Sequence, residues 1–485
     1  MMYKDTPVIL TQTGEVTGQR MIPQAELEHV DAKSYYGKAF RAEKLPLPNL
    51  SEIGVIRHYT NLSLKNYGVE NGTYPLGSCT MKYNPKINED SAGLPGFANS
   101  HPLQPDSTIQ GNLELLWDLE KKLSFICGMD RFSFQPAAGA HGELLGLLLI
   151  KAYHEKRGDT KRNVMIIPDS AHGTNPASAM MVGYDVREVK SNEKGMVDIG
   201  ALKKAIGDGE EIAGLMLTNP STLGIFDESI LEITKLIHDA GGLNYYDGAN
   251  LNAITMRVRP GDMGFDVVHL NVHKSFSTPH GGGGPGAGPV GLKKILEPYM
   301  PVPFVQPDGD KFKLVHESED SIGKIRGFIG SHGIFVRTYA YILANGRQGL
   351  REVSEGAVAN SRYIYERVKD YYRVGTTSKT MHEFVISADN LKSKYGVTAM
   401  DVAKRLIDYG FHPPTVYFPL IVPEALMVEP TETETKRDLD GLADALIQIA
   451  KEAETDPDVI KAAPHNTPIA RPNETQAARN PILKV

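Results

Sequence analysis

Between residues 164 and 271, short apolar runs alternate with segments of helical periodicity, and this alternation limits the possible folds more than any other feature. The helical segments lie near residues 176–182, 199–206 and 230–240. The apolar runs, which we expect to be strands, are Val164–Pro168, Val186–Val189, Ile212–Thr218, Leu243–Tyr246 and Val267–Asn271. Strands and helices in this order form a mostly parallel sheet covered by helices on both faces. The sequence therefore predicts an α/β domain.

The length of 485 residues predicts two or three domains. Residues 1–107 are rich in Pro, Gly, Asn and Tyr and predict an extended arm with short helices, of the kind that wraps a neighbouring subunit or domain. Residues 108–345 are expected to form the large α/β domain. Residues 346–485 are expected to form a smaller C-terminal α/β domain, with strands at Phe384–Ser387, Val416–Leu420 and Leu426–Val428 and an extended tail from about Pro457.

Composition narrows the function. A net charge of -7 without a basic run argues against nucleic acid as the main partner. With only two cysteines, Cys79 and Cys127, a disulfide framework is excluded, and a reducing cytoplasmic location is expected. No 18 apolar residues run together and the first residues lack a secretory pattern, so neither a membrane span nor a signal peptide is predicted.

One lysine, Lys274, occupies a position in the sequence where a catalytic residue is expected. Lys274 follows the apolar run that ends at Asn271 and precedes the glycine-rich loop Gly281–Gly286. It would therefore emerge at a strand end beside a mobile loop. A partly desolvated lysine has a lowered pKa and acts as an amine nucleophile, which Schiff-base formation with an aldehyde cofactor requires. Pyridoxal phosphate is the predicted cofactor.

Two further motifs fit a phosphate-bearing aromatic cofactor. The first is a small-residue turn that opens a helix, in which Ala138, Gly139 and Ala140 would let a phosphate approach backbone N–H groups. The second is the loop from Asp169 to Pro176, where His172 at a strand end is suited to stack on a ring and to move protons. Taken singly, close helix packing and a structural histidine explain these motifs equally well or better.

Two more strand ends supply partners for a pyridine ring. Asn219 is suited to donate to the ring's 3-oxygen, and Asp247 to keep the ring nitrogen protonated. Ala249 is small enough for a ring to lie on it. An aspartate before Gly-Ala is otherwise a turn or capping residue. Because all these residues end successive predicted strands, we interpret them together with Lys274 as one site.

A metal site is the competing use of His269, His273 and His280. We predict no metal, because cysteines and carboxylates at ligand spacing are missing and His269 is expected to face the other side of its strand from its neighbours. Cys79 is interpreted as a buried small residue in preference to a redox thiol.

Four segments carry a family resemblance: Tyr74–Pro85, Gln135–Glu143, Asp169–Pro176 and His273–Gly286. With these, the chain resembles the glycine cleavage system P-protein, the decarboxylating glycine dehydrogenase, in particular the pyridoxal-phosphate-bearing subunit of its two-subunit form. The resemblance covers nearly the whole chain. It implies the fold of type I pyridoxal-phosphate enzymes, with a large sheet domain and a smaller C-terminal one.

The same resemblance implies roles for single residues. Lys274 corresponds to the Schiff-base lysine, His172 to the ring-stacking residue, Asp247 to the partner of the pyridine nitrogen and Ala249 to the contact on the opposite ring face. The phosphate cup corresponds to Ala138, Gly139 and Ala140, and we count His273, beside the lysine, among the cofactor-binding residues. The roles of Ser277 and Thr278 stay open, and no motif identifies an arginine for the substrate carboxylate.

The implied reaction is decarboxylation of glycine with release of CO2. The resulting carbanion equivalent is protonated by His172 or Lys274, and the aminomethyl group passes to the lipoyl arm of the H-protein. The implied partners are this lipoylated H-protein and a sister subunit 1, in an α2β2 heterotetramer. A long arm needs a channel to a buried cofactor, and the Gly281–Gly286 loop is a hypothetical gate, testable by substituting Gly282 and Gly284 with alanine.

Two rival functions remain at this stage. Another type I enzyme, such as an aminotransferase or cysteine desulfurase, would share Asp247 and Lys274 but has no use for the Tyr74–Pro85 segment. A desulfurase also needs a cysteine on a mobile loop, whereas Cys127 ends a predicted helix. A catalytically silent scaffold subunit would lack Lys274.

Overall fold

The computed structural model describes residues 6–12, 26, 28, 30–41, 43, 47–48, 50–281 and 286–483. The chain divides into two compact units, one made of Met1–Gly68 with Thr467–Val485 and the other of Val69–Asn466. Every residue of the sheet and of the candidate site belongs to the second unit.

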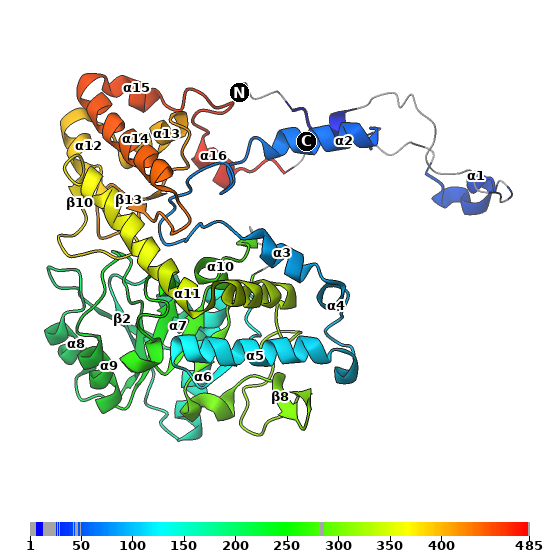
Figure 1. Cartoon of the computed structure of the whole chain (residues 1–485), viewed down its shortest axis with the longest axis vertical. Coiled ribbons are helices and arrows are strands. Elements are labelled where there is room, and N and C mark those ends of the chain that lie inside the picture. Colours follow the sequence, from blue (N-terminus) through cyan, green and yellow to red (C-terminus); the bar gives the residue numbers. More distant parts are fainter. Residues whose placement is uncertain are drawn as a thin grey trace. The chain divides into compact units, whose positions relative to one another are not determined.

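A seven-stranded sheet forms the centre of the second unit, with the strand order β1-β7-β6-β5-β4-β2-β3. Its strands are β1 (Arg131–Ser133), β2 (Val164–Pro168), β3 (Asp185–Val189), β4 (Ile212–Leu217), β5 (Leu243–Gly248), β6 (Val267–Leu270) and β7 (Val290–Leu292). The five strands from β6 to β3 are parallel to their neighbours, and β7 is antiparallel to both β6 and β1. The predicted α/β sheet is confirmed, and Figure 1 shows it in green beneath the helices of the C-terminal half.

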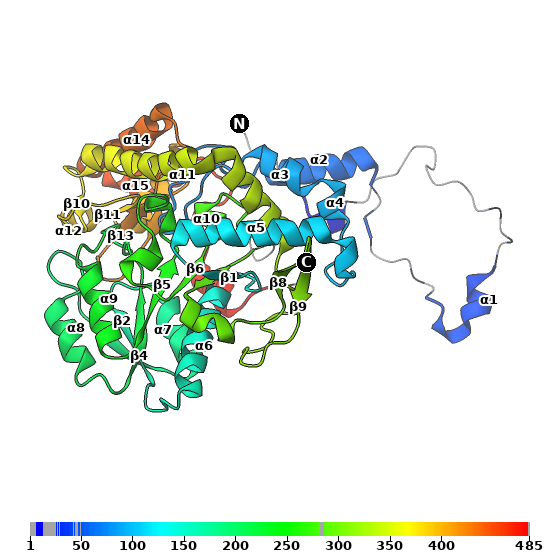
Figure 2. The ribbon, with the colours of Figure 1, turned by 60° about the horizontal axis from the view of Figure 1, so that its bottom comes forward.

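Helices cover both faces of this sheet. Alternate residues of β2 separate the faces, since Val164 and Ile166 pack in one apolar cluster while Met165 and Ile167 pack in another. The first cluster includes residues of α5, α8 and α9, and the second includes residues of α6 and α7, an arrangement that Figure 2 shows from the side. Their bounds are α5 (Gln110–Cys127), α6 (Gly139–Lys156), α7 (Thr174–Val182), α8 (Ile199–Ile206) and α9 (Ile230–Asp239).

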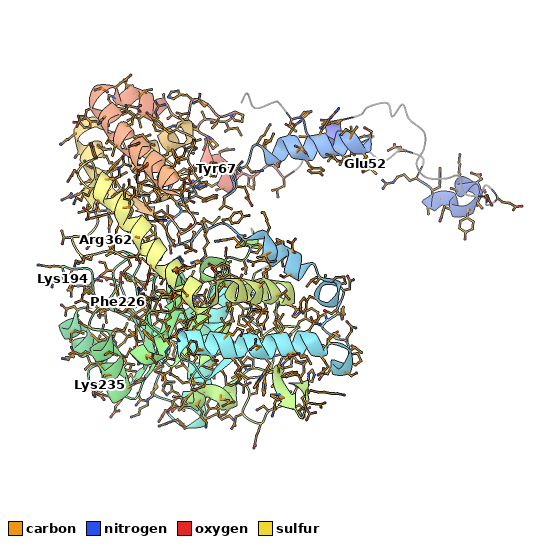
Figure 3. All side chains as sticks on the ribbon, in the orientation of Figure 1. Glu52, Tyr67, Lys194, Phe226, Lys235 and Arg362 are labelled. Atoms are coloured by element: carbon orange, nitrogen blue, oxygen red, sulfur yellow. The ribbon has the colours of Figure 1, made fainter. Side chains whose placement is uncertain are left out.

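The covering helices are amphipathic, which explains why these sequences are helical. In α9, Ile233 and Ile237 are fully buried against the sheet, whereas Lys235 pairs with Asp239 on the exposed side (Figure 3). In α8, Asp198 caps the N-terminus by accepting a hydrogen bond from the Ala201 N–H at 2.7 Å. The spacing of apolar residues in the sequence is therefore the spacing of the buried faces.

A second, antiparallel sheet with the order β10-β11-β13-β12 has its own apolar core. Capping boxes begin two of the helices around it, at Thr398 with Asp401 and at Thr435 with Asp438. The strands are β10 (Arg373–Val374), β11 (Phe384–Ser387), β12 (Thr415–Val416) and β13 (Ala425–Val428). The helices are α11 (His332–Val368), α12 (Asp389–Tyr395), α13 (Ala399–Asp408), α14 (Lys436–Thr455) and α15 (Pro457–Ala462). The first of these breaks at Gly346, where φ is 59°.

Several elements differ from the sequence-based expectations. The strand expected over residues 416–420 ends at Val416, and Pro419 has no N–H for a sheet hydrogen bond. The stretch from Pro457, expected to be a tail, begins with helix α15. Short elements without a clear period were not anticipated: β1, β7, the hairpin of β8 (Phe304–Asp308) and β9 (Lys311–Val315), and the helical turn α10 (Val272–Ser275).

The N-terminal segment contains short helices, as expected. In the first unit these are α1 (Ala32–Tyr36) and α2 (Glu52–Ser63), together with α16 (Glu474–Arg479) from the end of the chain; in the second unit they are α3 (Lys86–Ala92) and α4 (Pro95–Ala98). None of the helices formed by the described residues combines the length and the apolar character that a membrane span needs.

Candidate active site

A cavity of about 510 Å³ opens at the carboxyl ends of the parallel strands. The strand order places β5 and β6 side by side at the centre of the sheet, which is where open α/β sheets bind ligands. The lining residues are Ala137, Ala138, Gly139, Ala140, Glu143, His172, Thr174, Asp247, Ala249, His269, Asn271, His273, Lys274, His280 and Gly286.

Lys274 lies on the helical turn α10, which follows β6 directly. The turn is held by a hydrogen bond from the Lys274 N–H to the Asn271 carbonyl at 2.8 Å. Because the backbone turns here, Lys274 is brought to the cavity wall together with His269 and His273. The side chain is partly buried. The amine of Lys274 therefore faces the cavity from the turn that follows β6.

The N-terminus of α6 forms another wall of the cavity. Its first N–H groups have no acceptor within the helix, and the helix dipole makes this end positive. The backbone is closely approached here, since a Cβ on Gly139 would lie 2.3 Å from Asn271 Oδ1 and one on Gly288 would lie 2.1 Å from the Ala138 carbonyl oxygen. Ala138, Gly139 and Ala140 thus form a cradle of backbone donors suited to a phosphate.

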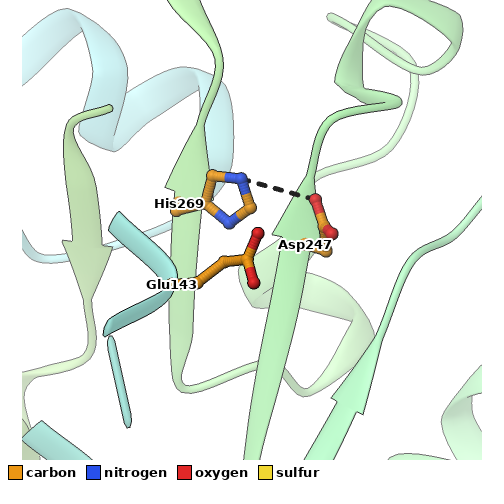
Figure 4. Close-up of side chains that lie close together, drawn as sticks. All are labelled: Glu143, Asp247 and His269. Atoms are coloured by element: carbon orange, nitrogen blue, oxygen red, sulfur yellow. Dashed lines mark ion pairs between the residues drawn. The ribbon is translucent and has the colours of Figure 1, made fainter. Parts of the chain in front are cut away.

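Asp247 presents a buried carboxylate at the end of β5. Burial opposes its ionisation, but His269, the Ala249 N–H, Asn175 and Lys274 together hold its pKa below the usual value. The Ala249 N–H donates to Oδ1 at 3.0 Å and Asn175 donates to Oδ2 at 3.1 Å. His269 Nε2 lies 3.4 Å from Oδ1, drawn as a dashed line in Figure 4. Asp247 is therefore a fixed negative charge.

Glu143 lies beside this carboxylate (Figure 4), and both of its carboxylate oxygens accept hydrogen bonds. Thr174 Oγ1 donates to its Oε1 at 2.8 Å, while Ser178 Oγ and Asn175 Nδ2 donate to its Oε2 at 2.9 and 3.2 Å. Asn175 thus holds both carboxylates through one amide group. These contacts fix α6 and α7 relative to β5, so that the cradle and Asp247 keep their separation.

His172 and Ala249 both line the cavity. Thr174 positions the imidazole, since its hydroxyl oxygen lies 2.9 Å and its backbone nitrogen 3.2 Å from His172 Nδ1. The ring also contacts Phe418, with ring centroids 5.6 Å apart. The histidine is held in place in the absence of any ligand contact.

Two further histidines meet beside Lys274. The rings of His273 and His280 are 4.7 Å apart at an angle of 69°. Burial, reinforced by His280 and Lys274, lowers the pKa of His273 to about 3, and burial with Lys274 lowers the pKa of His280 to about 4. Both rings are therefore neutral at physiological pH, and this wall of the cavity carries no histidine charge.

The structure brings eight of the nine predicted site residues to this cavity: Ala138, Gly139, Ala140, His172, Asp247, Ala249, His273 and Lys274. Asn219 is placed elsewhere. Its side-chain oxygen accepts from the Asp227 N–H at 2.8 Å, so its amide closes the loop from residue 219 to 227 and does not reach the cavity. Gly282 and Gly284, which the gate hypothesis invokes, lie outside the described residues.

Glu143, Thr174, Asn271 and His280 were not anticipated as site residues. His269, expected to face the other side of its strand from its neighbours, lines the cavity and lies opposite Asp247 across β5 and β6. Carboxylates do stand beside this histidine, since ligand atoms of Glu143, Asp247 and His269 lie within 4.8 Å of one another. The alternation of side chains along β5 and β6, together with the register between these two strands, would have placed His269 beside Asp247.

The two cysteines lie in different surroundings. Cys127 is buried at the end of α5. Cys79 is partly exposed, and burial raises its pKa to about 11, a shift that the charge of Lys274 opposes. Cys79 is therefore a protonated thiol at physiological pH, which is a poor nucleophile.

Sequence relatives identify the family. The chain is 59% identical to the probable glycine dehydrogenase (decarboxylating) subunit 2 of Caldanaerobacter subterraneus, over 96% of this chain and 95% of that protein. It is 56% identical to the protein of the same description from Listeria innocua, over 96% and 94%, and 53% identical to that of Staphylococcus haemolyticus, over 100% and 98%. A family model described as glycine dehydrogenase, C-terminal domain, matches residues 353–468.

Solved structures agree on the fold. A glycine decarboxylase (P-protein) of the glycine cleavage system, in inhibitor-bound form, superposes with a TM-score of 0.70 at 19% identity, over 86% of this chain and 94% of that one. The cysteine desulfurase CsdA from Escherichia coli superposes with a TM-score of 0.61 at 15% identity, over 83% and 99%. This is the type I fold of pyridoxal-phosphate enzymes. The chain belongs to the family of glycine dehydrogenase (decarboxylating) subunit 2, within the P-proteins of the glycine cleavage system.

Proposed function

We propose that this chain decarboxylates glycine, using pyridoxal phosphate held covalently by Lys274, and passes the aminomethyl group to the lipoyl arm of an H-protein. One observation carries the proposal: an amine, a helix N-terminus and an ionised carboxylate face the same cavity, each from a different element. These are the three groups that an aldehyde, a phosphate and a pyridine nitrogen require.

Each lining residue has a place in holding the cofactor. The backbone N–H groups of Ala138, Gly139 and Ala140 would receive the phosphate, and Asp247 the protonated ring nitrogen. His172 and Ala249 would face the ring from its two sides, and His273 would border it next to Lys274. When bound, the cofactor supplies a protonated pyridine that accepts the electron pair left behind by CO2.

The protein's own contribution is electrostatic. Asp247 stays ionised because His269, Asn175 and the Ala249 N–H hold it, so a positive charge on the ring nitrogen is stabilised where electrons must flow. Neutral His273 and His280 form a wall without charge. Among the described residues no arginine lines the cavity, so a glycine carboxylate would be poorly solvated here, which favours its loss as CO2.

Two residues of the cavity are suited to move the protons of the reaction. Lys274 carries an amine, and His172 an imidazole whose Nδ1 is already held by Thr174. General acids and bases within reach of the reacting groups contribute about 10²- to 10⁴-fold to a rate.

The proposal includes partners. The family description "subunit 2" implies a partner subunit 1, and we propose an α2β2 heterotetramer that receives lipoylated H-protein in the cytoplasm. The first unit offers contact area for such an assembly, since α2 carries Ile53, Ile56 and Tyr59 on its surface, each more than half exposed. Two free cysteines suit a reducing compartment.

Exchange of labelled bicarbonate into glycine tests the proposal. The purified chain is mixed with subunit 1 and lipoylated H-protein, and label in glycine is measured with each component left out in turn. Exchange in the complete mixture, lost when this chain is omitted, is the expected result. A complete mixture without exchange would refute the proposed activity.

A further inference from the structure

A second cluster of ionisable residues lies at the ends of two strands of the C-terminal sheet, near enough to Lys274 for its charge to act on them. His382 and Glu383 directly precede β11, and Glu429 directly follows β13. All three side chains are buried, with exposures of 0%, 0% and 1%. Their potential ligand atoms lie within 4.8 Å of one another. None of the three lines the cavity described above.

Both carboxyl groups are held by the Tyr74–Pro85 segment. The Ser78 N–H donates to Glu383 Oε2 at 2.8 Å, and Asn250 donates to Oε1 at 3.2 Å. The Thr80 N–H donates to Glu429 Oε2 at 2.9 Å, and the Thr80 hydroxyl donates to Oε1 at 2.5 Å. The two groups are therefore oriented, but by neutral donors only.

The charges around the pair are few. Burial raises the pKa of Glu383 well above its usual value and also raises the pKa of Glu429. The like charge of Glu429 adds to this effect on Glu383, and the like charge of Glu432 adds to it on Glu429. The positive charge of Lys274 lowers the pKa of both groups. Glu432 is itself paired with Lys82 at 2.9 Å. The other titratable neighbours, Cys79 and His382, are neutral, since burial raises the pKa of the first to about 11 and lowers that of the second to about 3.

His382 completes the cluster without a hydrogen bond of its own. Its Nε2 lies 3.8 Å from Glu429 Oε1 and 4.0 Å from Glu383 Oε1, and both ring nitrogens lack a partner in the described structure. Both carboxyl groups face the same ring nitrogen, Nε2. The neutral ring adds no charge beside the pair, and its Nε2 can present either an N–H or a lone pair to it.

A bound metal fits this cluster less well than a proton. Tetrahedral sites with bonds of about 2.0–2.2 Å place ligand atoms about 3.4 Å apart, closer than the separations from His382. Three of the four carboxyl oxygens already accept from the backbone or from Thr80, and the charge of Lys274 acts against a second cation.

We propose that Glu383 and Glu429 share one proton, with His382 between them, and that Lys274 draws this proton from the pair and returns it during each turnover. The inference rests on the proposed function. The pair acts through Lys274, so both glutamates are positioning residues in the sense that they set the protonation of the reacting amine.

The proton balance of the proposed reaction gives such a store a use. Glycine arrives as an ammonium carboxylate and gives up one proton when its nitrogen becomes a nucleophile. The C–COO⁻ bond then breaks, CO2 leaves without a proton, and the electron pair forms a C–S bond with one sulfur of the lipoyl disulfide. The S–S electron pair leaves on the other sulfur, which needs one proton to become a thiol. When the aminomethyl group leaves as a neutral amine, the proton lost first equals the proton needed last.

Infrared spectroscopy of the apoprotein tests the shared proton without any turnover. We expect a protonated-carboxyl band at about pH 7 that shifts in frequency in both Glu383→Gln and Glu429→Gln, because the remaining carboxyl group is still buried but has lost the partner with which it shared the proton. Glu434→Gln is the matched control: Glu434 also has a pKa raised by burial, but it bonds to Thr73. Its substitution should leave the band of the pair in place. Absence of the band in the native apoprotein, or a stoichiometric metal in its place, would overturn the proposal.

The pH profile of glycine–bicarbonate exchange then tests the link to Lys274. Exchange should fall by about 100-fold in either Gln variant at high pH, with the descending limb moved to lower pH, and Glu429→Asp should recover part of the native profile. If the rate falls equally at every pH, the pair is structural and the inference fails. If the native mixture shows no exchange at all, the proposed function fails, while the infrared result still decides the shared proton.

Discussion

Two buried clusters in this chain have the same composition, two carboxyl groups and one histidine, but opposite charge states. In the first, Asp247 has a lowered pKa and every carboxylate oxygen of Glu143 and Asp247 has a close polar neighbour. In the second, Glu383 and Glu429 have raised pKa values, and neither ring nitrogen of His382 has a hydrogen-bond partner in the described part of the chain. Burial raises the carboxyl pKa in both.

The difference comes from the neighbours. Asp247 accepts from an amide side chain and a backbone N–H and also has an imidazole at 3.4 Å, whereas the imidazole of the second cluster stands 3.8 and 4.0 Å from its carboxyl groups. The charge of His269 lowers the pKa of Asp247, whereas the like charge of Glu429 adds to burial in raising the pKa of Glu383. One cluster is therefore built to hold a charge, the other to hold a proton.

Removing Lys274, the cation that acts on both clusters, should have the largest effect. In Lys274→Ala we expect exchange activity to fall by about 10⁴-fold, because the amine that attaches the cofactor and moves protons is gone. The yellow absorbance of the purified protein, which borohydride removes in the native chain, should be absent. Lys86→Ala, which removes an exposed ion pair with Glu70, is the control and should keep both. Native-like colour in Lys274→Ala would contradict the assignment.

Neutralising the first cluster should come next. Asp247→Asn keeps the shape but not the charge, so the ring nitrogen loses its partner and exchange should fall by about 100- to 1,000-fold while the cofactor still binds. Activity and cofactor content are measured on the same samples. Asp266→Asn changes a carboxylate at the start of β6 that bonds to His238 and the Asn244 N–H, far along the strand from the cavity, and should lower stability without this loss. Equal losses in both variants would show that the charge of Asp247 has no special role.

The two histidines offer a matched test of the hydrogen-bonding difference. His269→Phe leaves the Tyr245 hydroxyl and the Asn271 amide without a partner, so we expect it to lower the free energy of unfolding by about 1–3 kcal/mol. His382→Phe removes two nitrogens that already lack partners and should stay within about 1 kcal/mol of the native value. Urea unfolding of both apoproteins measures these differences. A larger loss in the free energy of unfolding for His382→Phe would mean that the His382 nitrogens form hydrogen bonds in solution.

The smallest effect should appear in the pH dependence of stability. A pKa that is raised in the folded state, as at Glu383 and Glu429, stabilises the protein at low pH. This stabilisation is lost as the pH rises through that pKa. The lowered pKa of Asp247 stabilises above its ordinary value of 3.8 and is lost as pH falls. The urea midpoint of Glu429→Gln should therefore rise relative to that of the native chain as the pH increases above 4.5, the ordinary pKa of glutamate. The urea midpoint of Asp247→Asn should rise relative to that of the native chain only as the pH is lowered. The reverse order would contradict both charge assignments.

Much of the architecture could be read from residue patterns. The strands at Val164–Pro168 and Phe384–Ser387 and the helix at Ile199–Ile206 have the bounds that their apolar spacing predicts. Strand-end motifs also identified Lys274, Asp247 and the Ala138–Ala140 turn, because parallel strands bring their carboxyl ends to one edge. The antiparallel β7 was missed, since a three-residue strand has too few positions to show a period.

The site divides in the same way. Local sequence determined which residues can do chemistry: a lysine after a buried strand, a small-residue turn before a helix, an aspartate at a strand end. Only the tertiary structure decided that Asn219 closes a loop, that His269 faces Asp247, and that Glu383 and Glu429, 46 positions apart in the chain, meet in one cluster. The physical reason is that residue type and spacing determine the local conformation and which side chains can be buried. A pKa, in contrast, depends on every group within a few ångströms, and those groups come from distant parts of the chain.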